Sequence, residues 1–297
     1  MKKTVRNFFN GLAFGITETV PGVSGGTIAL ILGFYYELIR SVNHFRKDYK
    51  KSLNFLIPLL LGVAVGALAF SSIINFFLKN YSFPTMTFFI GLITGIIPAI
   101  YSKVKEPGKI FNVKEIILIL LPIILLVLIS NLKGMADSVT DPAEVIKNID
   151  VLFMVFIFFV GMMAAAALVI PGISGSFVML LCGIYPLFTY TLSSVRILLA
   201  DIANIELWLN ICKVLGPLGI GIIIGGLSMA RLIEKLLNNY TKIIYSVILG
   251  LLLGSVYALF NDPIVYQSGI SLPIIILGAE TLFFGAVISY NLGKRRF

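Results

Sequence analysis

Apolar residues run along this chain in long stretches that short polar segments separate. Stretches of about 20 residues match the length at which an α-helix crosses the hydrocarbon core of a bilayer. Such stretches predict transmembrane helices at 53–78, 83–101, 113–132, 211–229, 243–260 and 272–292. The longest polar segment, 131–150, has no periodicity of its own, so we expect no soluble domain.

Two further apolar stretches, 5–39 and 151–193, are interrupted by helix-breaking residues. The sequence Pro-Gly-Val-Ser-Gly-Gly-Thr begins at Pro21, and Pro-Gly-Ile-Ser-Gly-Ser-Phe begins at Pro171, 150 residues later. Unbroken helix is the rule in hydrocarbon, so each break has to line a cavity or be buried in protein. We therefore predict two re-entrant hairpins, with paired half-helices at 5–20 and 27–39 and at 151–170 and 176–193.

The two halves of the chain resemble each other beyond the breaks. At the offset of 150, Gly11, Gly33 and Tyr35 are answered by Gly161, Gly183 and Tyr185. At an offset of 159, Gly62, Gly66, Tyr81, Gly91 and Gly95 are answered by Gly221, Gly225, Tyr240, Gly250 and Gly254. This pattern predicts a first repeat at 1–132, an external linker at 133–150 and a second repeat at 151–297. A hairpin plus three spans makes an odd number of crossings, so the second repeat is expected to be inverted.

Composition and charge agree with an all-α polytopic membrane protein. The chain is 58% hydrophobic and 12% charged. With the amino terminus in the cytoplasm, the hairpin topology puts 18 of the 23 Lys and Arg residues inside, as the positive-inside rule favours. We therefore expect a multi-pass plasma-membrane protein with both termini cytoplasmic. The net charge of +9 belongs to this topology pattern, which disfavours nucleic acid as a partner.

Metal-ligating and catalytic residue types are scarce. The two cysteines lie in or beside apolar segments and predict neither a disulfide framework nor a metal site, and no cofactor motif is present. Both breaks contain Gly-x-Ser-Gly, the pattern of an intramembrane serine protease, which needs a histidine base. The single histidine, His44, lies in a basic loop. We therefore predict transport or channel function and no enzyme.

The breaks have the composition of an anion site. Glycines let the backbone approach a ligand, and the second half-helix of each hairpin would direct free N–H groups at the break. If the hairpins enter from opposite sides, both tips approach the bilayer midplane. The expected phosphate-binding residues are Ser24, Gly25, Gly26, Thr27, Ser174, Gly175 and Ser176. The alternative is that the breaks only let helices pack closely.

Charged residues near the breaks suggest further roles. Glu18 lies one turn before Pro21, and its counterpart at the offset of 150 is Leu168. A carboxyl group among apolar residues favours its neutral form, so Glu18 is a proton-coupling candidate. The alternative is a structural, neutral Glu18 hydrogen-bonded to the break. Glu280 is a second, weaker candidate for a buried acid, and Arg40 and Arg231 are either snorkelling anchors or phosphate partners.

The run Glu18-Thr19-Val20-Pro21-Gly22-Val23-Ser24-Gly25-Gly26-Thr27-Ile28-Ala29-Leu30, with Pro171-Gly172-Ile173-Ser174-Gly175-Ser176, resembles the polyprenyl-phosphate (undecaprenyl-phosphate, PopT-type) transporter family. The resemblance covers essentially the whole chain. It implies a translocase that returns the lipid carrier from the outer to the inner leaflet for cell-wall synthesis. Ser176-Phe177 replaces Gly26-Thr27, which puts equal contributions of the two tips in doubt.

Two other functions remain open from the residues. One is a transporter or channel for a small soluble anion, and the other is an intramembrane hydrolase. A lateral opening wide enough for a prenyl chain would favour the lipid over the soluble anion. The sequence does not predict the oligomeric state.

Overall fold

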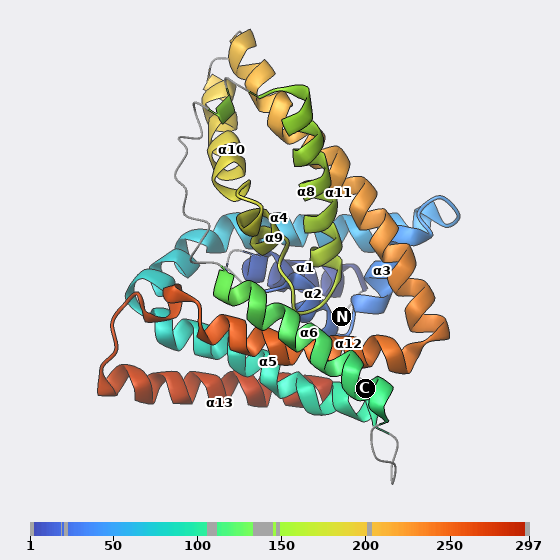
Figure 1. The fold of residues 1–297 in the computed structure, drawn as a ribbon, viewed down its shortest axis with the longest axis vertical. Coiled ribbons are helices and arrows are strands. Elements are labelled where there is room, and N and C mark those ends of the chain that lie inside the picture. The colour runs from blue at the N-terminus through green and yellow to red at the C-terminus, as the bar shows by residue number, and fades with distance from the viewer. Residues whose placement is uncertain are drawn as a thin grey trace. The chain divides into compact units, whose positions relative to one another are not determined.

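The described part of the protein is helical. The computed structural model describes residues 3–18, 20, 23–105, 112–132, 145–146, 149–200 and 204–294. Pro21, Gly22 and most of the predicted linker 133–150 lie outside these ranges. The elements are α1 (Lys3–Glu18), α2 (Gly25–Ile31), α3 (Tyr35–Asn43), α4 (Tyr49–Asn80), α5 (Ser82–Val104), α6 (Val113–Leu132), α8 (Val151–Val169), α9 (Gly175–Leu181), α10 (Tyr185–Ala200), α11 (Ile205–Asn239), α12 (Thr241–Phe260), the 3₁₀ helix η2 (Pro263–Tyr266) and α13 (Leu272–Lys294) (Figure 1). The all-α prediction is confirmed for these residues.

Six helices in the described ranges are long and apolar enough to cross a membrane. They are Tyr49–Phe70, Ser82–Val104, Val151–Val169, Ile205–Asn239, Thr241–Phe260 and Leu272–Lys294. The helix α6 has the bounds predicted for the span 113–132. The helix α8, predicted as one arm of a hairpin, is itself long enough to cross.

Two helices are longer than the apolar stretches that predicted them. The predicted spans 53–78 and 211–229 lie inside α4, with 32 residues, and α11, with 35 residues. Polar residues at the helix ends continue the backbone hydrogen bonding, which hydropathy does not detect. Each long helix joins the next through one tyrosine, Tyr81 (φ −140°, ψ 49°) or Tyr240 (φ −138°, ψ 45°). The two tyrosines are matched at the offset of 159, so the repeat extends to this joint.

The helix that follows each break is shorter than predicted. The expected half-helices 27–39 and 176–193 are each divided, into α2 and α3 and into α9 and α10. Gly33 and Gly183 end α2 and α9 in the left-handed conformation, with φ of 69° and 70°. The N–H of Phe34 donates to the carbonyl of Ala29, and that of Ile184 to the carbonyl of Met179, which is the Schellman arrangement. Both α2 and α9 therefore have only seven residues.

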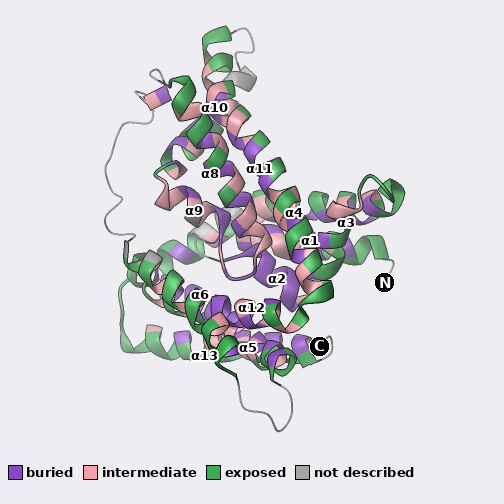
Figure 2. Ribbon diagram, turned by 45° about the vertical axis from the view of Figure 1, so that its right-hand side comes forward, coloured by how far each residue is buried: buried purple, intermediate pink, exposed green. Residues whose placement is uncertain are grey.

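Helix packing divides the chain into two compact units that cut across the predicted repeats. The first contains Met1–Asn131, Ile170–Ile173 and Ala230–Phe297, and the second contains Leu132–Val169 and Ser174–Met229. In the first unit, α1 packs on α4, and α5 packs on both α13 and α12. The short helix α2 is buried along its whole length (Figure 2). The core of the second unit lies between α8, α9 and α11 and includes Ile157, Val160 and Leu218.

Glycines hold matching helix pairs in backbone contact in the two halves. A Cβ added at Gly62 of α4 would collide with the carbonyl oxygen of Phe8 in α1. In the second unit, a Cβ at Gly221 of α11 would collide with the carbonyl oxygen of Phe158 in α8. Such contacts are possible only without a side chain. The glycines matched by the sequence offset thus have the same packing role.

The last helix of each predicted repeat packs on the middle span of the other. Gly91 and Gly95 of α5 lie against the backbone of α13, and Gly250 of α12 lies against the backbone of α6 at Ile119. All four helices belong to the first unit. The two halves therefore interlock here, which explains why the compact units do not follow the repeat boundary.

We predict that Gly221→Ala lowers the thermal stability of the purified protein in detergent, because the added methyl group must push α8 and α11 apart. Overpacking of this kind typically costs about 1–3 kcal/mol. The control is Gly219→Ala in the same helix, where an added Cβ has no atom of another element within 4 Å. Equal melting temperatures for the two variants would contradict the proposed role of these glycines.

Candidate functional site

Ser24 lies at the first break, in the position that precedes α2. Its backbone is extended, with φ −97° and ψ 125°, and its carbonyl accepts hydrogen bonds from the N–H groups of Thr27 and Ile28. The residue is only 2% exposed. Its hydroxyl group has no hydrogen-bond partner within the described residues. A buried polar group without a partner is unfavourable, so Ser24 retains an unused capacity to bind a ligand.

Glu18 closes the first break from the end of α1. Its Oε1 atom accepts a hydrogen bond of 2.9 Å from the N–H of Gly25, the first residue of α2. A Cβ at Gly25 would collide with this carboxyl group and with the ring of Phe14. The helix α2 therefore folds back against α1, and Gly25 permits the close approach. Gly26, the next residue, is buried in the first turn of α2.

The two breaks meet at Thr27 and Gly172. The N–H of Gly172 donates a 2.9 Å hydrogen bond to the hydroxyl oxygen of Thr27, which is 1% exposed. Gly172 has φ +94°, a conformation that favours glycine, and an added Cβ would approach Leu251 of α12 to 3.0 Å. Both residues belong to the first unit. The two break sequences are thus in direct contact, and the Thr27 hydroxyl is the hydrogen-bond acceptor in this contact.

The second break differs from the first in how its serines are used. Ser174 precedes α9 with an extended backbone, as Ser24 precedes α2, and is 3% exposed. Its Oγ lies 2.6 Å from the Oγ of Ser176, so these two hydroxyls bond each other. A Cβ at Gly175 would lie 2.7 Å from the carbonyl oxygen of Ala164 in α8. The predicted inequality of the tips is therefore present in their hydrogen bonding.

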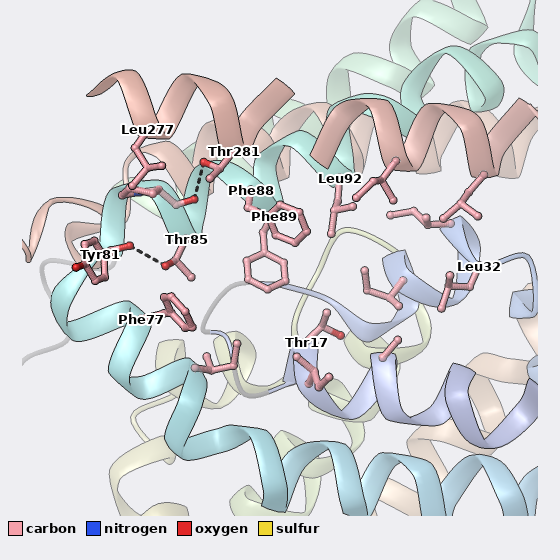
Figure 3. A pocket seen from close by; sticks show the side chains of 18 residues that line it. Thr17, Leu32, Phe77, Tyr81, Thr85, Phe88, Phe89, Leu92, Leu277 and Thr281 are labelled. Carbon is pink, nitrogen blue, oxygen red and sulfur yellow. Dashed lines mark hydrogen bonds between the residues drawn. The ribbon is translucent and has the colours of Figure 1, made fainter. Parts of the chain in front are cut away.

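An apolar cavity of about 800 Å³ lies beside α2 in the first unit (Figure 3). Ile28, Ile31 and Leu32 line it from α2 and from the turn that follows. Aromatic and aliphatic side chains of α1, α4, α5 and α13 complete the wall. Phe77 and Leu277 on this wall are 44% and 39% exposed, so the cavity opens to the surroundings of the protein. No local sequence pattern marks this cavity, because its walls come from helices far apart in the chain.

The threonine hydroxyls in the cavity wall are already hydrogen-bonded within the protein. Thr85 donates to the carbonyl of Tyr81, and Thr281 donates to the carbonyl of Pro84 (Figure 3). Thr17 donates to the carbonyl of Phe14. Each of these hydroxyls already donates its proton to a backbone carbonyl. The cavity therefore suits an apolar chain better than a charged group.

Arg40 and Arg231 line one polar pocket of about 500 Å³. Arg40 lies on α3 and Arg231 on the last part of α11, both in the first unit. His44, considered above only as a missing protease base, lines the same pocket. Proximity in space thus brings together three residues that the sequence pattern left apart. Glu280 lies on α13, where its side chain is exposed on the protein surface and does not line this pocket.

Comparison with known proteins identifies the family to which this chain belongs. Residues 14–269 match the model of a family described as undecaprenyl phosphate translocase-like. A polyprenyl-phosphate transporter of Staphylococcus aureus (strain NCTC 8325 / PS 47) is 29% identical over 291 residues, which cover 97% of this chain and 95% of the relative.

A polyprenyl-phosphate transporter of Vibrio cholerae serotype O1 (strain ATCC 39315 / El Tor Inaba N16961) is 28% identical over 263 residues, covering 84% of this chain and 75% of the relative. No solved structure matches the chain. The family match covers both breaks, the cavity-lining part of α5 and most of the spans. The chain belongs to the undecaprenyl phosphate translocase-like family, as the resemblance of its paired break sequences predicted.

Proposed function

We propose that this protein is a lipid-carrier translocase that moves undecaprenyl phosphate or a related polyprenyl phosphate from the outer to the inner leaflet of the plasma membrane. The lipid is then reused in cell-wall synthesis. The names of the two relatives support a polyprenyl phosphate as substrate. The direction of transport and the cytoplasmic placement of both termini belong to the proposal.

The observation that carries the proposal is the position of α2 between the breaks and the apolar cavity. Thr27, in the first turn of α2, contacts the second break, while Ile28, Ile31 and Leu32 line the cavity. A polyprenyl phosphate has an anionic head and a long apolar tail. The head would bind at the breaks, where the hydroxyl of Ser24 has no partner among the described residues, and the tail would occupy the cavity. The phosphate-binding residues remain those named from the sequence.

The apolar cavity favours the lipid over a small soluble anion. A soluble anion needs a polar, hydrated path, whereas the cavity wall is aliphatic and aromatic with occupied threonine hydroxyls. A hydrolase would need a base beside Ser24 or Ser174. The only histidine of the chain lies in the polar pocket with Arg40 and Arg231. Transport of the lipid is therefore the function that best accounts for both the break sequences and the apolar cavity.

We predict that the purified protein in proteoliposomes moves a labelled polyprenyl phosphate between leaflets. A leaflet-accessibility assay measures the movement, with protein-free liposomes as the baseline. A competing release assay measures efflux of trapped inorganic phosphate. Lipid movement without phosphate efflux is the expected result. Efflux of inorganic phosphate without lipid movement would replace the proposal by the soluble-anion transporter.

For the anion site, we predict that Ser24→Ala lowers the rate of lipid transport about tenfold while the melting temperature stays unchanged or rises. The hydroxyl has no partner to lose within the described residues, so its removal should not weaken the fold, whereas a charged phosphate would lose a donor. Ser289→Ala is a matched control, because Ser289 is also a buried serine whose hydroxyl lacks a partner, but it lies on α13. Equal transport by the two variants would remove Ser24 from the site.

For proton coupling, we predict that Glu18→Gln binds the lipid but loses the response of transport to an imposed pH gradient. The amide oxygen of glutamine can still accept the hydrogen bond from Gly25, so the break is kept while the titrating proton is lost. Glu280→Gln is the control, since Glu280 is an exposed carboxyl group of the same type. The measurement is uptake of labelled polyprenyl phosphate by proteoliposomes with and without the pH gradient. If transport by the Glu18→Gln protein responds to the gradient as wild-type transport does, Glu18 has only a structural role.

A further inference from the structure

The polar pocket named above lies between α3 and the last part of α11. We call it the cationic pocket, and its wall is formed by Tyr36, Arg40, His44, Arg231, Glu234, Lys235 and Asn238. These residues come from segments about 190 positions apart in the sequence, and all of them belong to the first unit. The pocket has a volume of about 500 Å³, which is ample for a phosphate group.

Hydrogen bonds hold the two sides of the cationic pocket together. Asn43 Nδ2 donates to the carbonyl of Ala230 at 2.8 Å and to Glu234 Oε2 at 2.7 Å. At the other side, the hydroxyl of Tyr36 donates to Asn238 Oδ1 at 3.2 Å. The helices α3 and α11 are thus joined at two places along the pocket. A framework joined in this way positions the basic side chains before a ligand arrives, which lowers the cost of binding.

The charges in the cationic pocket leave it positive. Its one carboxylate, Glu234, is half-buried and already accepts from Asn43, and its Oε1 lies 3.5 Å from His44 Nδ1. Arg40, Arg231 and Lys235 are exposed, and none of them forms an ion pair with an acidic side chain of the described residues. Arginine donors match the geometry of phosphate oxygens and bind them in pairs. Three cations that have no acidic partner in the described part of the chain therefore line a pocket whose single carboxylate is already hydrogen-bonded.

A second cavity shares Tyr36 with the cationic pocket and is also lined by α2. This neighbouring cavity of about 290 Å³ is lined by Leu30 of α2, by Gly33 in the turn after it and by Tyr36 of α3. Tyr36 also lines the cationic pocket. Leu30 and Tyr36 therefore place the neighbouring cavity beside both α2 and the cationic pocket. The snorkelling role considered for Arg40 and Arg231 does not explain why the two side chains line one pocket.

We propose that the cationic pocket is a second anion site, which binds a terminal phosphate group through Arg40, Arg231 and Lys235. The phosphate belongs either to a polyprenyl phosphate leaving the break or to free phosphate from the solution. For the lipid, the inference rests on the proposed function and gives the headgroup a place to bind on the side of the basic loop 40–51. For free phosphate, it stands independently of transport.

The test is equilibrium binding of two probes, radiolabelled inorganic phosphate and farnesyl phosphate, to the detergent-purified full chain. We expect Arg40→Gln with Arg231→Gln to weaken the binding of at least one probe about tenfold or more, because charge-assisted hydrogen bonds are lost. The control is Lys47→Gln with Lys51→Gln, which removes the same charge from exposed residues outside the pocket. Higher salt should weaken wild-type binding, since the cations are exposed to solvent. Size-exclusion profiles and melting temperatures verify that both double variants are folded.

Loss of farnesyl phosphate binding in the arginine variant, but not in the lysine control, supports the pocket as a lipid-headgroup site. Loss confined to inorganic phosphate supports it as a site for free phosphate. Wild-type binding of both probes by the arginine variant, or equal losses in the two double variants, overturns the proposal. Transport by the wild type is measured separately in proteoliposomes. If the wild type binds phosphate through the arginines but moves no lipid, the proposed transport function is refuted while the proposed anion site stands.

Discussion

A break in a helix leaves backbone N–H and C=O groups without helical partners, and the partners that these groups find determine how the two break sequences pack. The N–H of Gly25 donates to the Glu18 carboxyl group, and the N–H of Gly172 donates to the Thr27 hydroxyl group. The partners of both glycines are side chains from the first half of the chain. The first half therefore supports its own break and part of the second one.

Two residues therefore have both a proposed functional role and a structural one. Thr27 and Glu18 were expected from the sequence to contact a ligand and to carry a proton, and the structure also makes them hydrogen-bond acceptors for the backbone. Ser24 has no such task within the described residues. In this part of the chain the Ser24 hydroxyl has no hydrogen-bond partner, whereas the hydroxyls of Ser174 and Ser176 form a hydrogen bond with each other.

The sequence predicted those features that depend on local pattern. Apolar length located five of the six helices that are long and apolar enough to cross a membrane, whereas the sixth, α8, was expected as one arm of a hairpin. The offset of 159 matched glycines that have the same packing role in α4 and α11. Local pattern missed the division at Gly33 and Gly183, because a positive φ within an apolar run leaves no change in hydropathy. It also missed the apolar cavity and the convergence of Arg40 with Arg231, which depend on packing between distant segments.

The apolar cavity has a mechanical consequence. On one side of it, α1 and α4 touch backbone to backbone through Gly11, Gly15, Gly62 and Gly66, and on the other side α5 and α13 do so through Gly91 and Gly95. Glycine contacts of this kind leave little room for sliding, so each pair behaves as a stiff block. The side chains that line the cavity lack dispersion contacts with the opposite wall. A guest that fills the cavity would supply these contacts and would set the spacing of the two helix pairs.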